Sequence, residues 1–171
     1  WAAIAISRSR GHRIWNSRAC FMPKNSPGRQ RLKSMNVPEI RTGLGWDVHR
    51  ITAGRPLILG GVTIPSEFGL DGHSDADILL HAVTDALLGA AALGDIGMHF
   101  PDTDPRWKGA ASARFLEHAV TLAKDAGYSL VNVDTTVILE RPKLKDFRSA
   151  IRESLAKVLG LSLDRVSIKF K

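Results

Sequence analysis

Three polar residues interrupt an apolar, helix-forming stretch at a regular spacing. Asp77, His81 and Asp85 stand four residues apart, so on a helix they share one face. Upstream, Asp47 and His49 flank Val48 in a strand-like run, where residues two apart point the same way. Two histidines and an aspartate from two elements predict a zinc site formed by Asp47, His49 and His81, with one coordination position open. A single histidine is more often a core or surface group, so the prediction depends on the three residues meeting in the fold.

Gly72-His73-Ser74 precedes this helix and offers a second kind of chemistry. Backbone N–H groups at a helix start, with a hydroxyl and an imidazole beside them, suit a phosphate group. Simple capping of the helix by Ser74 or Asp75 is the commoner use of such residues, and the two interpretations are compatible.

Two loops carry further polar groups. Gly94-Asp95-Ile96-Gly97 with Phe100–Asp104 could bind sugar hydroxyls, and the run Glu140–Lys145 could hold a base or a phosphate. Judged by their chemistry alone, both are better explained as surface turns that satisfy their own backbone groups.

The elements that must position these residues alternate irregularly between strand and helix. Periodicity predicts strands at 42–51, 57–59 with 62–64, 130–139 and 165–170, and helices at 76–93, 110–126 and 146–159. Gly43 and Gly45 in the first strand indicate a close backbone approach to a ligand, or a bulge. The pattern predicts an α+β fold, a mixed four-stranded sheet with helices packed on one face.

Composition excludes several classes of protein. The 171 residues contain one cysteine, Cys20, so no intrachain disulfide or cysteine-based zinc site is expected. No apolar run is long enough to span a membrane. The net charge of +7 lies in residues 1–40, which hold eight basic residues and one acidic residue, whereas residues 41–171 hold sixteen of each. No nucleic-acid partner is therefore expected for the globular part.

Residues 1–40 lack periodicity and are rich in Arg, Ser, Asn and Pro, which predicts a disordered or non-native basic tail preceding a domain at 41–171. A transit peptide and a nucleic-acid-binding arm are alternatives. Upstream sequence, with Met35 as the natural start, is preferred. This favours a bacterial cytoplasmic protein, with a plastid as the alternative location.

The motifs taken together resemble the 2-C-methyl-D-erythritol 2,4-cyclodiphosphate synthase family of the non-mevalonate isoprenoid pathway. The resemblance covers about residues 41–171. It rests on segments that occur in the family's order and spacing: Asp47-Val48-His49, Gly60-Gly61, His73–Asp77, His81, Thr84–Gly89, Gly94–Gly97, Phe100–Asp104 and Arg141-Pro142-Lys143.

The resemblance implies a homotrimer with an active site at each subunit interface. Zinc would be bound by Asp47, His49 and His81, one ion per subunit, with a substrate phosphate as the fourth ligand. His73, as the catalytic residue, and Ser74 would contact the diphosphate. The remaining implied substrate contacts are Asp47 and His49 themselves, Asp95 and Gly97 for the ribose, Phe100, Asp102 and Asp104 for the erythritol part, and Leu139, Arg141, Pro142, Lys143, Leu144 and Lys145 around the cytosine.

The implied reaction is an intramolecular phosphoryl transfer. The 2-phosphate of 4-diphosphocytidyl-2-C-methyl-D-erythritol 2-phosphate attacks the β-phosphorus, CMP leaves, and the cyclic diphosphate forms. Such chemistry asks the protein mainly for positioning and charge neutralisation, which the zinc and a substrate-bound Mg²⁺ or Mn²⁺ would assist.

The end of the chain departs from the family pattern. Phe170 stands where the family has Ala, and Lys171 is the last residue, so a following Thr, a metal-binding Glu and a closing strand are absent from the sequence. This predicts a C-terminally truncated domain that forms the zinc site but catalyses poorly. The alternative function is therefore a catalytically impaired trimeric fragment that binds zinc and ligand only.

Overall fold

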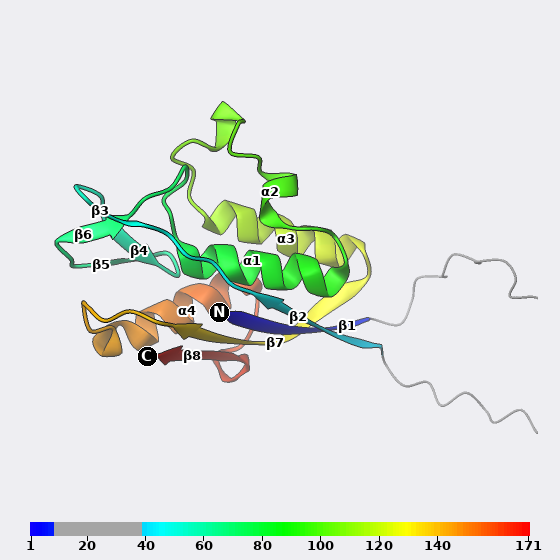
Figure 1. The fold of residues 1–171 in the computed structure, drawn as a ribbon. Coiled ribbons are helices and arrows are strands. Elements are labelled where there is room, and N and C mark those ends of the chain that lie inside the picture. Colours follow the sequence, from blue (N-terminus) through cyan, green and yellow to red (C-terminus); the bar gives the residue numbers. More distant parts are fainter. Residues whose placement is uncertain (9–38) are drawn as a thin grey trace, which may run out of the picture.

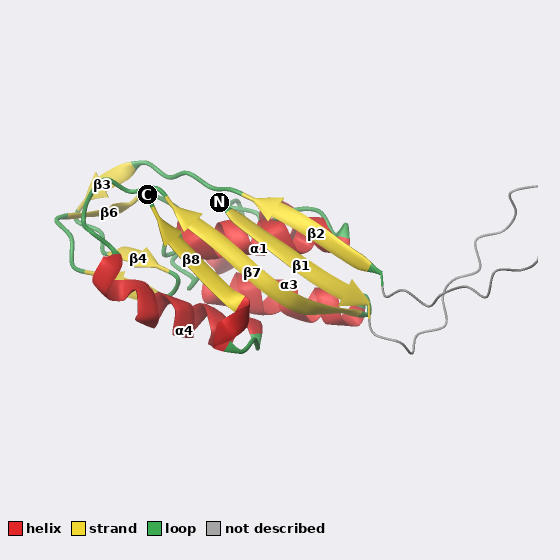
Figure 2. Ribbon diagram, turned by 90° about the horizontal axis from the view of Figure 1, so that it is seen from below, coloured by secondary structure: helices red, strands yellow, loops and turns green. Residues whose placement is uncertain are grey.

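The computed structural model describes residues 1–8 and 39–171. Four strands form the main sheet in the order β2-β1-β7-β8 (Figure 2). They are β2 (Ile40–Gly45), β1 (Ala2–Arg8), β7 (Tyr128–Val137) and β8 (Val166–Phe170). β7 and β8 run parallel and the other pairs are antiparallel, so the predicted mixed four-stranded sheet is confirmed.

The helices α1 (Ile78–Ala91), α3 (Ala113–Asp125) and α4 (Arg148–Leu159) pack on one face of this sheet (Figure 1). Two hairpin-like pairs lie beside the start of α1: β3 (Ile51–Ala53) with β6 (Phe68–Leu70), and β4 (Leu57–Leu59) with β5 (Val62–Ile64). Short helical segments complete the fold, namely α2 (Ile96–His99) and 3₁₀ turns at Pro105–Trp107, Lys145–Phe147 and Leu163–Arg165.

The prediction that residues 1–40 lie outside the fold is wrong for residues 1–8. β1 lies inside the sheet, with Ala2 paired to Gly45 on one side and to Thr135 on the other. Ala2, Ile4 and Ile6 alternate into the core and are at most 2% exposed. This alternation of apolar residues is short, and the basic residues that follow it made the whole segment resemble a tail. The rest of the predicted tail, residues 9–38, lies outside the described residues.

The first predicted strand is split. β2 ends at Gly45 and β3 begins at Ile51, and residues 46–50 between them adopt no regular structure. The other predicted elements lie within about three residues of the observed ones, apart from a four-residue helix, α2, inside a predicted loop. The splitting places Asp47 and His49 on an irregular connection, which is free to turn both side chains toward α1.

Gly43 and Gly45 let β2 contact the backbone of α1. A Cβ atom at Gly43 would lie 2.0 Å from the carbonyl oxygen of Ala86, and one at Gly45 would lie 2.0 Å from that of Ala82. The close approach predicted from these glycines is confirmed, but its partner is a helix and not a ligand. The contact fixes the position of α1 against the strand that leads into Asp47.

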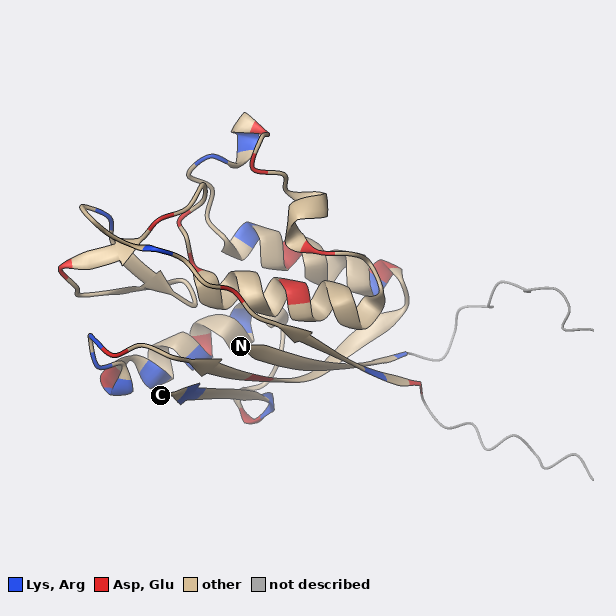
Figure 3. Ribbon diagram, viewed as in Figure 1, with Lys and Arg blue, Asp and Glu red and all other residues tan. Residues whose placement is uncertain are grey.

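Acidic and basic residues are interspersed along α3 and α4 (Figure 3). Among the helices of the described residues, none combines the length and apolar character needed to cross a bilayer.

Candidate metal centre

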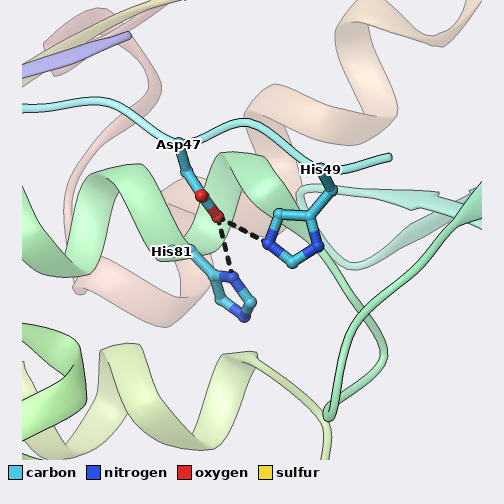
Figure 4. A group of neighbouring side chains, drawn as sticks. All are labelled: Asp47, His49 and His81. Atoms are coloured by element: carbon cyan, nitrogen blue, oxygen red, sulfur yellow. Dashed lines mark hydrogen bonds and ion pairs between the residues drawn. The ribbon is translucent and has the colours of Figure 1, made fainter. Parts of the chain in front are cut away.

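The three predicted metal ligands meet at the start of α1 (Figure 4). Asp47 Oδ2 lies 3.0 Å from His49 Nε2 and 3.0 Å from His81 Nδ1. All three ligand atoms lie within 4.8 Å of one another, and each side chain is half-buried. The proximity that sequence spacing alone could not establish is therefore present in the fold.

Each histidine is held by the ring nitrogen that points away from Asp47. His49 Nδ1 lies 2.5 Å from the carbonyl oxygen of Asp71, which can only accept a hydrogen bond. His81 Nε2 lies 2.8 Å from Ser112 Oγ. Hydrogen bonds of this kind orient metal-binding imidazoles and leave the opposite nitrogen free to bind an ion.

Electrostatics also favour a cation at this point. Burial opposes ionisation of Asp47, but hydrogen bonds with His49 and His81 outweigh it and hold the pKa of Asp47 below its usual range. The hydrogen bond to Asp47, outweighing partial burial, raises the pKa of His49. The cluster thus contains an ionised carboxylate and two imidazoles that attract positive charge.

The donor set fits zinc. Two imidazole nitrogens and one carboxylate oxygen form a three-ligand catalytic set with one position left for water or substrate. Tetrahedral bonds of about 2.0–2.1 Å place ligand atoms roughly 3.3 Å apart, close to the 3.0 Å Asp47–histidine distances here.

A cavity of about 420 Å³ opens beside the ligand cluster. Its wall includes His49 and His81 together with His73 and Ser74, the predicted phosphate contacts. Gly97, Phe100 and Asp102, three of the other predicted substrate contacts, also line it. Aromatic rings form its apolar side, with the centroids of Phe100 and Phe115 4.6 Å apart.

Arg55 fixes the loop that carries His73 and Ser74. Its guanidinium donates to the carbonyl oxygens of Gly72 and Ser74, each at 2.6 Å. Ser74 does not cap α1, as one interpretation predicted. Its hydroxyl accepts from Ala76 N at 3.1 Å and lies 3.1 Å from His81 Nε2, so Ser74 connects the loop to a metal-ligand candidate.

Asp77 is the N-cap of α1. Its backbone carbonyl accepts from His81 N at 3.0 Å, but its carboxylate bonds backbone N–H groups and neither imidazole. Its carboxylate accepts hydrogen bonds from Leu79 N and Leu80 N in the helix and from Gly60 N and Gly61 N in the turn between β4 and β5. Burial outweighs these four bonds and raises the pKa of Asp77 to about 6. The carboxylate of Asp77 therefore has a structural role, holding the turn between β4 and β5 on the start of α1.

Asp85 likewise serves the backbone. Its side chain accepts from Ile96 N at 2.8 Å, which ties α1 to α2. His81 and Asp85 both lie in α1, four residues apart, whereas Asp77 precedes the helix as its N-cap. The carboxylates of Asp77 and Asp85 accept from backbone N–H groups.

The remaining predicted substrate residues are divided. Asp95 caps α2 by accepting from Met98 N at 2.8 Å, and Asp104 caps the turn at 105–107 and pairs with Arg106. Leu139 lines a second cavity of about 350 Å³, which also includes Asp47 and His49. Neither of these two cavities includes the following loop: Arg141, Pro142, Lys143, Leu144 and Lys145. Leu144 is buried in the core.

Asp75 and Ser112 were not singled out as partners of the site. Ser112 lies just before α3 and Asp75 just before α1, and their side chains meet beside His81. Neither has a sequence signal of its own, because the two are brought together only by the packing of α1 on α3.

Comparisons with known proteins agree with this geometry. The family model described as the YgbB family matches residues 40–171. A 2-C-methyl-D-erythritol 2,4-cyclodiphosphate synthase of Solibacter usitatus is 74% identical over 79% of this chain and 85% of its own length. The enzyme of the same name from Laribacter hongkongensis is 61% identical over 77% and 82%.

Solved structures of 2C-methyl-D-erythritol-2,4-cyclodiphosphate synthase share the fold. One superposes with a TM-score of 0.73 at 50% identity, covering 75% of this chain and 86% of the other. A second, described as a CDP-bound form, has a TM-score of 0.72 at 48% identity with the same coverage. β1 lies outside the residues matched by the family model, although it is the strand between β2 and β7. By sequence and fold, the chain belongs to the YgbB family of 2-C-methyl-D-erythritol 2,4-cyclodiphosphate synthases.

Proposed function

We propose that this protein is a lyase that converts 4-diphosphocytidyl-2-C-methyl-D-erythritol 2-phosphate to 2-C-methyl-D-erythritol 2,4-cyclodiphosphate and CMP. The observation that carries the proposal is the meeting of Asp47, His49 and His81 at the wall of a cavity that His73 and Ser74 also line. A cation centre beside a hydroxyl and an imidazole suits a substrate with several phosphate groups.

The chain's own residues act chiefly by position. Two N–H groups in the first turn of α1, those of Leu79 and Leu80, are already taken by Asp77. This supports a phosphate contact made by the side chains of His73 and Ser74. Phe100 and Phe115 line the cavity, and apolar rings beside charged groups strengthen the charge interactions there by lowering the local dielectric constant. Holding the attacking phosphate against the β-phosphorus turns the transfer into an intramolecular step with a low entropic cost.

We infer that Asp47, His49 and His81 hold one Zn²⁺ per subunit, and that Mg²⁺ or Mn²⁺ arrives with the substrate. These ions would supply Lewis-acid neutralisation of the phosphate oxygens. Support comes from the donor types and their separations, described above.

The nucleotide end of the substrate is proposed to lie between Asp95 with Gly97 and the stretch Leu139–Lys145. A relative is described as binding CDP, and Leu139 shares a cavity with Asp47 and His49. Asp104 and Asp102 are proposed to act with Phe100 at the erythritol end.

A homotrimer is proposed because an apolar surface adjoins the metal ligands. Trp46, Val48 and Ile138 are 63%, 74% and 68% exposed, and all line the second cavity together with Asp47. Exposed apolar patches of this kind favour association, and a second subunit placed here would complete the nucleotide end of the site. The mass of the protein in solution, by analytical ultracentrifugation, tests this directly.

Two broader proposals accompany the function. Residues 41–171 are proposed as the synthase domain, to which β1 adds an inner strand. A bacterial cytoplasmic location is proposed, supported by bacterial relatives such as those from Solibacter and Laribacter.

The function is tested by measuring bound metal and CMP release on the same preparations. We expect about one zinc per chain and CMP release above background from the wild type, and loss of both in His81→Ala. Asp71→Asn is the matched control, because the Asp71 atom that bonds His49 is its backbone carbonyl oxygen, which the substitution leaves in place. Zinc without CMP release would favour the alternative, a fragment that binds zinc and ligand only. Absence of zinc from the wild type would refute the metal centre.

A further inference from the structure

Ser112 and Asp75 lie beside His81, and each stands where a side chain could cap a helix, but neither side chain does so. Ser112 is the N-cap residue of α3, yet its hydroxyl makes no capping hydrogen bond to that helix. Asp75 precedes α1, but the cap of α1 is Asp77. Ser112 is fully buried, and a buried hydroxyl keeps its place only when it has specific partners.

The hydroxyl of Ser112 has three partners: Asp75, His81 and Ser74, whose Oγ lies 3.2 Å away. Ser112 Oγ donates to Asp75 Oδ1, and Ser112 N donates to Asp75 Oδ2 at 3.1 Å. His81 Nε2 lies 2.8 Å from the same hydroxyl. Asp75 Oδ1 also accepts from Asp77 N at 3.3 Å, which orients the carboxylate from the α1 side.

The count of protons fixes the direction of this chain of hydrogen bonds. A serine hydroxyl has one proton, and the Asp75 carboxylate, which has none to give, takes it. Ser112 Oγ can then only accept. His81 Nε2 at 2.8 Å is its nearest possible donor, nearer than Ser74 Oγ at 3.2 Å, and this geometry places the proton on Nε2. In a neutral imidazole the lone pair then lies on Nδ1, the atom that faces Asp47 and His49.

We propose that Asp75 and Ser112 are positioning residues that hold His81 in the ring orientation and protonation state that bind the metal. The inference rests on the proposed function, since it concerns the affinity of the proposed zinc centre. It assigns to Asp75, acting through a serine, the orienting task that Asp77 and Asp85 do not perform.

The test is the dissociation constant of Zn²⁺, measured by competition with a chromophoric chelator. We expect Asp75→Asn and Ser112→Ala each to raise it about tenfold, in line with other outer-sphere partners of metal ligands. The double variant should be no weaker than the worse single variant, because both changes break one chain. Asp85→Asn is the matched control. It removes a carboxylate four residues from His81 that accepts a hydrogen bond from Ile96 N, and it should change the constant less than twofold.

A second readout follows the ring itself. In the zinc-loaded protein, we expect a slowly exchanging Nε2–H signal of His81 by NMR, identified by its loss in His81→Ala. Faster exchange is expected in Ser112→Ala, which removes the nearer acceptor at 2.8 Å and leaves Ser74 Oγ at 3.1 Å. If Asp75→Asn does not fold, Ser112→Ala decides the matter alone. Wild-type affinity and exchange in the folded variants would overturn the inference while leaving the zinc centre intact. A wild type that binds no zinc would overturn both.

Discussion

Two aspartates at the start of α1 are separated by one residue and serve different parts of the molecule. Asp77 belongs to a fold network, made of its carboxylate and the N–H groups of Gly60, Gly61, Leu79 and Leu80. Asp75 belongs to a site network, made of Asp75, Ser112, His81 and Asp47. The fold network holds a hairpin on a helix, and the site network holds a metal ligand.

The difference lies in what faces each carboxylate. Backbone N–H groups surround Asp77 whatever the neighbouring side chains are, so its contribution is to stability. Asp75 faces a hydroxyl that leads to an imidazole, so its contribution passes to the metal centre. Two identical residue types so close in the chain can be distinguished only by their three-dimensional partners, and changes on either side should separate the two networks.

The largest effect is expected where both networks depend on the position of α1. Gly45→Ala places a Cβ atom 2.0 Å from the carbonyl oxygen of Ala82, so the helix or the strand must move. We expect a loss of about 4 kcal/mol in the free energy of unfolding, measured by urea denaturation. Zinc affinity should fall too, since β2 leads directly into Asp47.

Gly89→Ala is the matched control on the same helix. A Cβ atom at Gly89 meets nothing within 4 Å, and alanine favours a helix by up to about 1 kcal/mol over glycine. Equal effects of the two substitutions would mean that the β2–α1 contact does not determine stability.

The next largest effect should be confined to the site network. Asp47→Asn keeps the shape of the side chain but removes the charge that faces both histidines. We expect the dissociation constant of Zn²⁺ to rise at least about 100-fold, near 2.7 kcal/mol of binding free energy, with the fold retained by circular dichroism. Asp71→Asn, at a side chain that is 65% exposed, should leave zinc binding unchanged. Unaltered affinity in Asp47→Asn would remove this residue from the ligand set.

The sequence predicted the features that depend on residue type and local spacing, but not those that depend on partners from distant elements. Asp47, His49 and His81 could be identified because few residue types bind metals, and because Asp47 and His49 are only two residues apart in the chain. The helix periods located α1, α3 and α4, and helix spacing placed Asp77, His81 and Asp85 on one face. The partners of these side chains lie on other elements, so the sequence could not predict that the carboxylates of Asp77 and Asp85 bond backbone N–H groups.

β1 could not be predicted from local pattern in the same way. Its partners are Gly45 and Thr135 for Ala2, and the second pairing spans most of the chain. The alternation of Ala2, Ile4 and Ile6 was a signal, but it is short and borders a basic segment. Strand pairing between distant segments carries little local signature, since the same alternation is stable only when both neighbours are present.

A smaller effect should appear in the fold network as a dependence on pH. Burial raises the pKa of Asp77 to about 6, above its value in the unfolded chain near 3.9, so the folded state binds the proton more tightly. The resulting stabilisation is complete below pH 3.9 and is lost as the pH rises through 6. Between pH 5 and pH 8 the wild type should lose about 1.4 kcal/mol from this group.

Asp77→Asn isolates that loss, because the other titrating groups are common to both proteins. The difference in unfolding free energy between variant and wild type should shift by that amount in favour of the variant on going from pH 5 to pH 8. A difference that does not change with pH would show that the four N–H donors keep Asp77 ionised throughout.

The smallest effect is expected at the loop that joins the two networks. Arg55 uses two nitrogens to hold the carbonyl oxygens of Gly72 and Ser74, on either side of His73. Lysine in its place can bond only one of them well, because its ammonium lacks the planar fork. Arg55→Lys should lower the free energy of unfolding by about 1 kcal/mol and raise the KM for the substrate, with zinc affinity unchanged. Arg50→Lys, at an exposed arginine nearby, is the control. If Arg55→Lys changed the zinc affinity as much as Asp75→Asn does, the loop and the metal ligands would form one network. His73 and Ser74 could then not move without moving His81.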